Sequence, residues 1–449
     1  AASDVYKRQP QPSAIDPIAD REWVSRLESE RDRVVARLGM DFSDERQLLP
    51  RLPWNTSFFA LPEQQLLAYE RHREASEVGQ VFQIANRAHD HVDAVVVFGA
   101  GAGWRGARML AEAGCDPFHN EWSRAKRGSK PRVYFIDDPV DNDRLHSLLA
   151  RLREGGYGDA PGERHWALIA CQPENPSASW QPTVDLIRQC MQPCGRLQGF
   201  AGDDRRTGDA SPTRPIMIEI ARKWKASYSI HRARSLRIPT AIDDAFSIMT
   251  PVGLLPSAFL GFDCIQLLVG AAAINENFSS ASFSDNLVLR LVAAGMTRER
   301  RRLRQSWAFW QRCLSGIGEW SRTLSVDAST DEPADEPTDA GTVDDLAVSA
   351  FRESYLRSVR NRPERASKRV CHHLAVAKIR TDPIETQQCN GDPIDQDELI
   401  AASREQAISE INAAGVRQTK LTLPEVNTHS IGQLLQLLML ASVVESGLD

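Results

Sequence analysis

The sequence lacks the features that would place it among nucleic-acid-binding, membrane or secreted proteins. Its 449 residues carry a formal net charge of -6, so the excess of basic residues expected for a nucleic-acid binder is absent. Apolar runs such as 265–274 are too short to span a bilayer, and 1–12 is polar and basic instead of forming an apolar secretory segment. We therefore expect a cytoplasmic protein that binds neither nucleic acid nor membrane.

The cysteines lack the close spacing that is typical of redox and metal sites. None of the eight cysteines forms a CxxC pair, and several, such as Cys171, lie in apolar runs, which predicts reduced thiols. Cys371 is followed by His372 and His373, a group that could suggest a metal site. Its flanks read as a strand, which sends neighbouring side chains to opposite faces, so a core strand is the favoured interpretation. No metal and no cofactor are predicted.

An alternation of strand-like and helix-like segments is what the sequence does contain. Apolar runs read as strands and are each followed by a helical pattern. The strands are predicted at 93–98, 132–136 and 166–171, and the helices at 105–113, 143–154 and 183–191. This order is typical of a parallel sheet covered by helices on both faces.

A second alternating region begins near Ile238, and a helical region over 20–76 precedes the first one. The second region contains an apolar segment at 258–275, an Arg-rich segment at 297–314, a strand at 369–379 and helices at 396–414 and 430–444. The cluster 298–304 is either a basic patch for phosphates or nucleic acid, or the solvated face of a helix leading into Trp307. The overall acidity favours the helix.

These segments suggest a division of the chain into domains. We expect an N-terminal tail with helices, a first domain, a second domain and a C-terminal helix, at 1–76, 77–235, 236–429 and 430–449. Residues 325–342 are acidic, contain proline and have almost no large apolar side chains, so a disordered surface loop is expected there. Both ends of the sequence read as incomplete.

A glycine-rich turn follows the first predicted strand. Gly101, Gly103 and Gly106 fit the G-x-G-x-x-G pattern of dinucleotide-binding turns. The acidic residue expected about 20 positions further on is not evident, since Asp137 and Asp138 lie too far along the chain. A dinucleotide enzyme is therefore one interpretation of this turn, on a weak motif.

Two longer stretches resemble a known family. Phe246–Asp263 continues through Leu267–Phe278, and Leu423–Glu445 has the form of a late family helix; weaker matches lie at 99–108 and 133–149. In these segments the chain resembles the glucose-6-phosphate isomerase family in its bacterial form. The family also uses a glycine-rich turn, which accounts for the pattern at Gly101.

The resemblance implies a fold and a reaction. The expected fold is α/β, with two sugar-isomerase (SIS) domains, each a parallel sheet flanked by helices, in a homodimer that binds a sugar phosphate. The family interconverts glucose 6-phosphate and fructose 6-phosphate by proton transfer between C2 and C1 through an enediolate. A carboxylate acts as base, a guanidinium stabilises the oxyanion, and a Ser/Thr-rich loop holds the phosphate.

The chain departs from the family at the positions that carry this chemistry. The family's Gly-Gly-Arg-Phe-Ser reads here as 243–247, Asp-Asp-Ala-Phe-Ser, so Ala245 replaces the arginine while Ser247 remains. The phosphate loop reads Gln-Pro-Glu-Asn-Pro-Ser over 172–177, in which only Ser177 keeps a hydroxyl; Ser179 lies nearby. The prolines remove N–H donors, and the acidic residues would repel a phosphate.

The remaining substrate and catalytic positions are also altered. Gly101 and Gly103 belong to the turn that would face the substrate, and Gly103 replaces a serine. Counting from Trp320, Asp327 takes the place of the catalytic base, with a solvated loop carboxylate as the alternative. A family histidine aligns with Ala347.

These departures limit the expected activity. We expect a glucose-6-phosphate isomerase family protein that is weakly active or inactive, or else a non-catalytic relative that binds a sugar phosphate or pairs with an active isomerase. Losing one oxyanion-stabilising donor alone typically costs roughly a hundred- to a thousandfold in rate.

Overall fold

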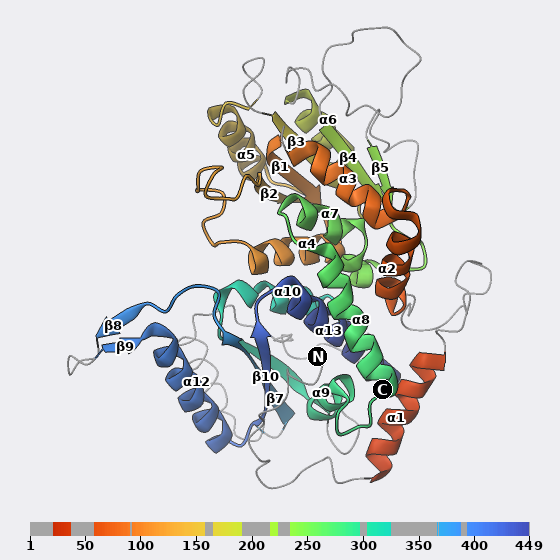
Figure 1. Cartoon of the computed structure of the whole chain (residues 1–449), viewed down its shortest axis with the longest axis vertical. Coiled ribbons are helices and arrows are strands. Elements are labelled where there is room, and N and C mark those ends of the chain that lie inside the picture. The colour runs from red at the N-terminus through yellow and green to blue at the C-terminus, as the bar shows by residue number, and fades with distance from the viewer. Residues whose placement is uncertain are drawn as a thin grey trace. The chain divides into compact units, whose positions relative to one another are not determined.

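The computed structural model describes residues 21–36, 58–89, 92–157, 165–190, 216–222, 234–296, 303–324, 366, 368–387 and 393–448. It divides into two compact units (Figure 1). One unit is Leu61–Ile265. The other combines the described parts of 1–60 with those of 266–449.

A five-stranded parallel sheet forms the centre of the 61–265 unit. Its order is β2-β1-β3-β4-β5, and every neighbouring pair is parallel. The strands are β1 (Val92–Gly99), β2 (Arg132–Asp137), β3 (His165–Cys171), β4 (Ile216–Ala221) and β5 (Arg234–Arg237). The runs of consecutive buried apolar side chains in β1 and β3 reflect a sheet that is covered on both faces.

Helices cover both faces of this sheet (Figure 1). On one face, α5 (Asn142–Glu154) and α6 (Trp180–Cys190) pack on β1 and β3, with Trp180 stacked on Phe98 at 4.6 Å between ring centroids. Near the other face lie α4 (Gly101–Gly114), α3 (Glu77–His89) and α7 (Pro251–Phe259). The unit also contains α2 (Leu61–His72), η6 (Arg73–Ala75) and η7 (Asp244–Met249).

The first unit extends further along the chain than the sequence suggested. Both η7 and α7 pack on α4, so the segment 236–265 lies with the first sheet, whereas the sequence pattern placed a boundary after residue 235. The unit ends at Ile265, in the first turn of α8 (Cys264–Ser280).

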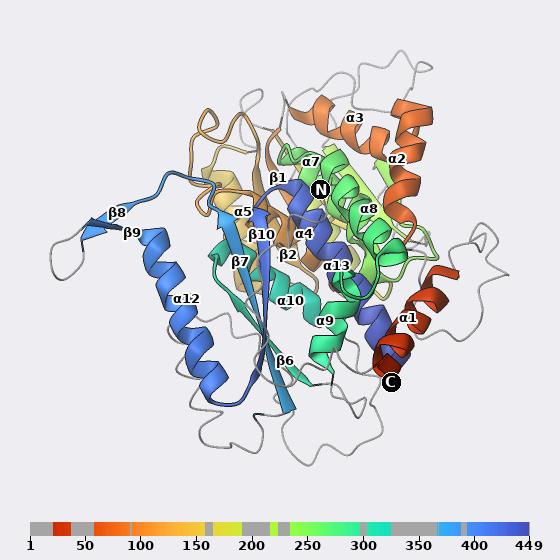
Figure 2. The same ribbon diagram turned by 60° about the horizontal axis from the view of Figure 1, so that its bottom comes forward.

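The second unit contains a three-stranded parallel sheet, which Figure 2 shows with α12 on one side. Its order is β10-β7-β6, from β6 (Arg304–Phe309), β7 (Arg369–Lys378) and β10 (Arg417–Glu425). Helix α12 (Gln396–Ala413) covers one face, and α9 (Leu287–Gly295) and α13 (Thr428–Leu448) contact β10. The other elements are α1 (Arg21–Ala36), η8 (Arg312–Leu314), α10 (Gly316–Arg322), β8 (Glu385–Gln387) and β9 (Pro393–Asp395). The expected fold class, parallel α/β sheets flanked by helices, is confirmed.

Two reciprocal glycines let α8 and α13 approach at backbone distance. A Cβ added to Gly432 would lie 2.0 Å from the carbonyl oxygen of Leu267, and one added to Gly270 would lie 2.1 Å from that of His429. Beside this crossing the buried Gln436 amide donates to Asn275 at 2.7 Å. The crossing joins the two segments that carry the family resemblance.

Two expectations from the sequence are wrong. Arg304 and Trp307 lie in a strand, β6, and not on a helix, because alternating aromatic side chains suit a pleated sheet; residues 297–302 lie outside the described part. The expectation that every apolar run is too short for a bilayer does not hold for α13, which is long and apolar enough to cross one. Its most apolar window is 83% buried inside the structure, which is the pattern of a core helix.

Candidate functional site

The carboxyl ends of three parallel strands lie side by side in the 61–265 unit. Gly99 of β1 pairs with Asp137 of β2 on one side and with Cys171 of β3 on the other. The predicted substrate residues Gly101, Gly103, Ser177 and Ser179 lie just beyond these strand ends, and Ser247 of η7 packs against the same turn. In a parallel sheet this is the edge where ligands bind.

The glycine-rich turn connects β1 to α4. Gly101 has a φ of +89°, a backbone conformation that L side chains rarely adopt, and it opens the first turn of α4. A Cβ at Gly101 would lie 2.2 Å from Oδ2 of Asp244, and one at Gly103 would lie 2.1 Å from Oγ of Ser247. Glycine is therefore required at both positions by the side chains of η7 that face them.

Asp244 binds the N-terminus of α4 through its carboxylate. Oδ2 accepts a hydrogen bond from the N–H of Ala102 at 2.6 Å. Burial raises the pKa of Asp244, while the hydrogen bonds from the N–H groups of Ala102 and Gly103 oppose that rise. The charge of Arg222 also lowers this pKa, but its effect is smaller than that of the two backbone hydrogen bonds, so backbone donors supply most of the compensation.

The neighbours of Asp244 hold it in this position. Asp243 caps η7 by accepting from the N–H of Ala245 at 2.9 Å. Ser247 is fully buried and donates its hydroxyl to the backbone carbonyl of Asp244 at 2.8 Å. Ala245, at the family's arginine position, is buried with 5% exposure and brings no charge to the site. Arg222 donates to the backbone carbonyls of Thr240 and Ile242.

A second carboxylate binds the loop after β3. Asp138, directly after β2, accepts from the N–H of Ser177 at 3.1 Å and from its hydroxyl at 2.6 Å. The hydroxyl of Ser179 lies 2.8 Å from that of Ser177. Both donors of the one serine left in the phosphate loop are thus directed at a carboxylate of the same chain.

The structure therefore brings the predicted substrate residues together in two groups. Gly101, Gly103 and Ser247 lie around Asp244, and Ser177 binds Asp138 with the hydroxyl of Ser179 beside it. The expected base Asp327, like Ala347 and the acidic segment 325–342, lies outside the described residues. Sequence reasoning missed the hydrogen-bonding roles of both carboxylates. It treated Asp244 as repelling an anion and not as replacing one, and it considered Asp138 only as the acidic residue of a dinucleotide site.

The turn also has the strand–turn–helix context of a dinucleotide site. Gly101 follows β1 and opens α4, as that motif requires. However, the N–H of Ala102, which would face a pyrophosphate, already binds Asp244. The geometry does not favour the dinucleotide interpretation.

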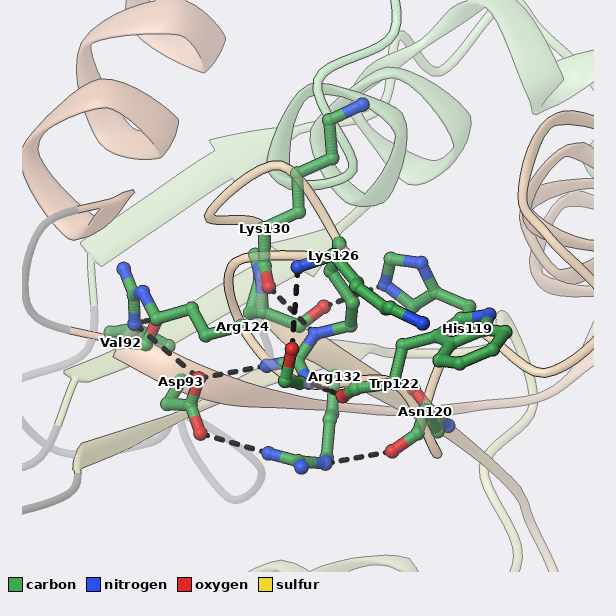
Figure 3. Close-up of polar contacts among 12 residues, drawn as sticks. Val92, Asp93, His119, Asn120, Trp122, Arg124, Lys126, Lys130 and Arg132 are labelled. Atoms are coloured by element: carbon green, nitrogen blue, oxygen red, sulfur yellow. Dashed lines mark hydrogen bonds and ion pairs between the residues drawn. The ribbon is translucent and has the colours of Figure 1, made fainter.

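A charged cluster lies at the opposite, amino-terminal edge of the same sheet. Figure 3 shows Asp93, near the start of β1, between Arg124 and Arg132. Arg127 joins them: its side chain is fully buried and donates to Oδ1 of Asp93 at 2.8 Å. The Tyr157 hydroxyl donates to Oδ2 at 2.7 Å, and burial, followed by this hydrogen bond, raises the pKa of Tyr157 to about 12.

This cluster holds the loop 115–131 against the sheet. Besides Asp93, the guanidinium groups donate to backbone carbonyls of His89, Val92, Asn120, Trp122 and Lys130. The arginine donors are taken by the chain itself, at the edge away from the strand carboxyl ends. We interpret the cluster as structural.

The Cys371–His373 group lies on β7, as predicted. His372 lies against Trp307 on one face, with 4.7 Å between ring centroids, while Cys371 packs with α12 on the other. His373 receives a hydrogen bond from Trp310 and contacts the Gln418 side-chain oxygen at 2.8 Å. Within the described ranges no group of three His, Cys, Asp or Glu residues could hold a metal ion.

Comparisons with curated proteins give relatives that are glucose-6-phosphate isomerases. No family model matches the chain. Glucose-6-phosphate isomerase of Symbiobacterium thermophilum is 26% identical over 273 residues, 60% of this chain and 54% of that protein. The Streptococcus mutans isomerase is 22% identical over 376 residues, 82% of this chain and 78% of that protein. The match to Listeria monocytogenes isomerase covers 52% of that protein, so the chain spans about half the length of this relative.

Solved structures show the same fold. The glucose-6-phosphate isomerase of Chlamydia trachomatis superimposes with a TM-score of 0.60 at 11% identity, over 96% of this chain and 80% of that chain. A hypothetical protein of Thermus thermophilus gives a TM-score of 0.65 at 20% identity, over 95% of this chain and 91% of that chain. At these identities the similarity establishes the fold.

Proposed function

Because the chain is a divergent relative of the glucose-6-phosphate isomerases, we propose that it is a protein of this family whose site sustains little or no isomerisation. The observation that supports this most directly is the hydrogen bond from Ala102 to the Asp244 carboxylate. It places a negative charge at the helix N-terminus beside the family's substrate positions, where an anionic ligand would need free N–H donors.

The groups that the family reaction requires are replaced or already hydrogen-bonded at this edge of the sheet. A developing enediolate needs a positive or hydrogen-bonding partner, but the arginine position holds the buried Ala245. A phosphate dianion needs the donors of the loop after β3, but those of Ser177 bind Asp138. We propose Asp327 for the position of the catalytic base, where its side chain is one methylene shorter than that of a glutamate.

The same contacts favour one of the two non-catalytic roles. A sugar-phosphate-binding protein would need the donors of Ser177 and of α4 to be free, whereas a partner of an active isomerase would not. We propose pairing, with a second copy of this chain or with an active isomerase, in the cytoplasm, as the alternative to weak catalysis.

A coupled assay on the purified chain tests the proposal. Fructose 6-phosphate is supplied, and glucose 6-phosphate is detected through a dehydrogenase that reduces a nicotinamide cofactor. We expect a rate at least roughly a hundredfold below that of a bacterial isomerase measured alongside, from the loss of one oxyanion donor. Turnover equal to that of the reference enzyme would refute the proposal.

A binding measurement separates the two remaining roles. Melting curves are recorded with fructose 6-phosphate and with 6-phosphogluconate, against chloride at equal ionic strength. A sugar-phosphate-binding protein would melt at a higher temperature with these ligands. The pairing role predicts no such rise, together with a mass above that of one chain in light scattering, either for the chain alone or after an active isomerase is added.

A further inference from the structure

We propose that Asp244 is an internal anion that keeps the N-terminus of α4 closed to ligands, and that removing its side chain turns the β1–α4 turn into a binding site for a phosphate group. The inference rests on the proposed function, since it explains how the same edge excludes a sugar phosphate. In this inference the Asp244 side chain itself blocks the N-terminus of α4. The loss of the family arginine at position 245 would not by itself block it.

The first step is that backbone N–H groups compensate the negative charge of Asp244. The carboxylate of Asp244 is largely buried and accepts a 2.6 Å hydrogen bond from the N–H of Ala102. A buried carboxylate requires such donors, because desolvation would otherwise disfavour the charged form, and the charge of Arg222 adds a smaller favourable contribution. The exposed N–H groups of a 14-residue helix supply them.

The second step is the shape of the turn. Oδ2 and Oδ1 of Asp244 lie 2.2 Å and 3.3 Å from the positions where Cβ atoms of Gly101 and Gly103 would be. Gly101 and Gly103 have no side chains, and the Asp244 carboxylate fills the space that this leaves in front of the turn. A phosphate oxygen that approached the same N–H groups would have to take this space, so ligand and side chain exclude each other.

The third step is that the occupant is fixed from its own element. Asp244 is the first residue of η7, Asp243 caps that helix through the N–H of Ala245, and Ser247 donates to the carbonyl of Asp244. The backbone that carries the carboxylate is therefore hydrogen-bonded on both sides. The side chain does not need an external ligand to hold it in the turn.

Three variants of the full chain test the inference, with inorganic phosphate as the probe. Asp244→Gly removes the side chain and opens the turn. Asp244→Asn removes the charge but keeps a group of the same size in the turn. Asp243→Asn removes a neighbouring charge and retains the oxygen that caps η7, so it is the matched control. Phosphate binding is followed by calorimetric titration and by melting temperature at constant ionic strength.

We expect Asp244→Gly to bind phosphate at least roughly tenfold more tightly than the wild-type chain, which is the gain from one charge-assisted hydrogen bond. Asp244→Asn and Asp243→Asn should bind no more tightly than the wild type. Equal affinity in Asp244→Gly and wild type would overturn the inference. An equal gain in Asp243→Asn would also overturn it, because charge and not occupancy would then control binding.

A measurement on the wild type covers the case in which Asp244→Gly does not fold. Crystals of the wild-type chain are soaked in phosphate. The inference predicts that Asp244 stays on Ala102, and a phosphate ion on that N–H with Asp244 displaced would overturn it. None of these measurements uses isomerase activity. If the wild-type chain is inactive but Asp244→Gly binds phosphate no more tightly than the wild type, this inference is overturned and the proposed function stands.

Discussion

The carboxylate of Asp244 lies 2.6 Å from the backbone nitrogen of Ala102, although 142 residues separate the two along the chain. This contact ties η7 to the first turn of α4 and fixes what the glycine-rich turn can accommodate. The turn has glycines at 101 and 103, and the room that they leave is filled by Asp244 and Ser247.

The first prediction concerns Gly103. A methyl group there would lie 2.1 Å from the hydroxyl of Ser247, a fully buried side chain that is held by the carbonyl of Asp244. Gly103→Ala should therefore lower the free energy of unfolding by about 1–3 kcal/mol, the usual cost of overpacking. Urea denaturation measures the change.

The companion substitution Ser247→Ala removes the colliding oxygen. In the double variant Gly103→Ala/Ser247→Ala, part of the lost stability should return, because the contact that caused the strain is gone. If the two substitutions add with no recovery, the collision between Gly103 and Ser247 is not the source of the effect.

The second prediction concerns Asp93. Asp93→Ala leaves Arg127, whose side chain is fully buried, beside two other guanidinium groups without a carboxylate. Breaking a buried ion pair in this way should cost about 3–5 kcal/mol of stability. The exposed pair of Arg108 and Glu112 serves as the control, since Glu112→Gln should cost at most about 0.5 kcal/mol. Similar losses in both variants would contradict a structural role for the cluster.

The third prediction tests the helix crossing in the second unit. A methyl group at Gly432 would lie 2.0 Å from the backbone carbonyl of Leu267, which cannot move without shifting α8. Gly432→Ala should therefore cost more than about 3 kcal/mol, beyond the usual range for overpacking a side chain. Urea denaturation measures this loss as well.

Gly128→Ala provides the comparison for that variant. At Gly128 the added methyl group meets no atom within 4 Å, and only the φ of +64° is unfavourable. Its cost should be about 1 kcal/mol. If Gly432→Ala is no more destabilising than Gly128→Ala, the backbones of α8 and α13 are not as close as described.

The crossing also explains which part of the fold could be predicted from the sequence. The segments Leu267–Phe278 and Leu423–Glu445 carry the family resemblance, and they belong to α8 and to the end of β10 with α13, which pack through Gly270 and Gly432. Such close packing requires glycine at both crossing points, which contributes to a recognisable pattern in these segments. The strands of the first sheet were predictable for a similar reason, since burial on both faces makes them continuous apolar runs.

The site could be predicted only in part, because its character depends on contacts between residues distant in the sequence. Substitution of the arginine position by Ala245 could be read directly. That Asp244 binds α4, and that Asp138 binds Ser177, requires the positions of separate loops at one sheet edge. From its charge alone, a carboxylate near an anion site is expected to repel the anion. The distances to the N–H and hydroxyl donors show instead that these carboxylates occupy the site.

The last prediction concerns acid stability and rests on the two histidines of β7. Burial lowers the pKa of His372 to about 3 and that of His373 to about 4, both from 6.5. In the unfolded chain both would titrate near 6.5, so between that pH and about 4 the unfolded state binds more protons than the folded state. Stability should be independent of these histidines above about pH 6.5 and should fall as the pH drops below it.

The size of the effect follows from the shift. For His373, a pKa lowered by about 2.5 units corresponds to about 3 kcal/mol lost by about pH 4, at about 1.4 kcal/mol per unit, as an upper limit. Urea denaturation across this pH range measures it in the wild type, in His372→Gln/His373→Gln and in His146→Gln, where the replaced histidine is exposed on α5. The double variant should lose the histidine contribution to the pH dependence between about 6.5 and 4, and His146→Gln should keep it. Glu77, whose pKa burial raises to about 7, contributes with the opposite sign in all three proteins and cancels in the comparison. An unchanged slope in the double variant would assign the acid sensitivity to other groups.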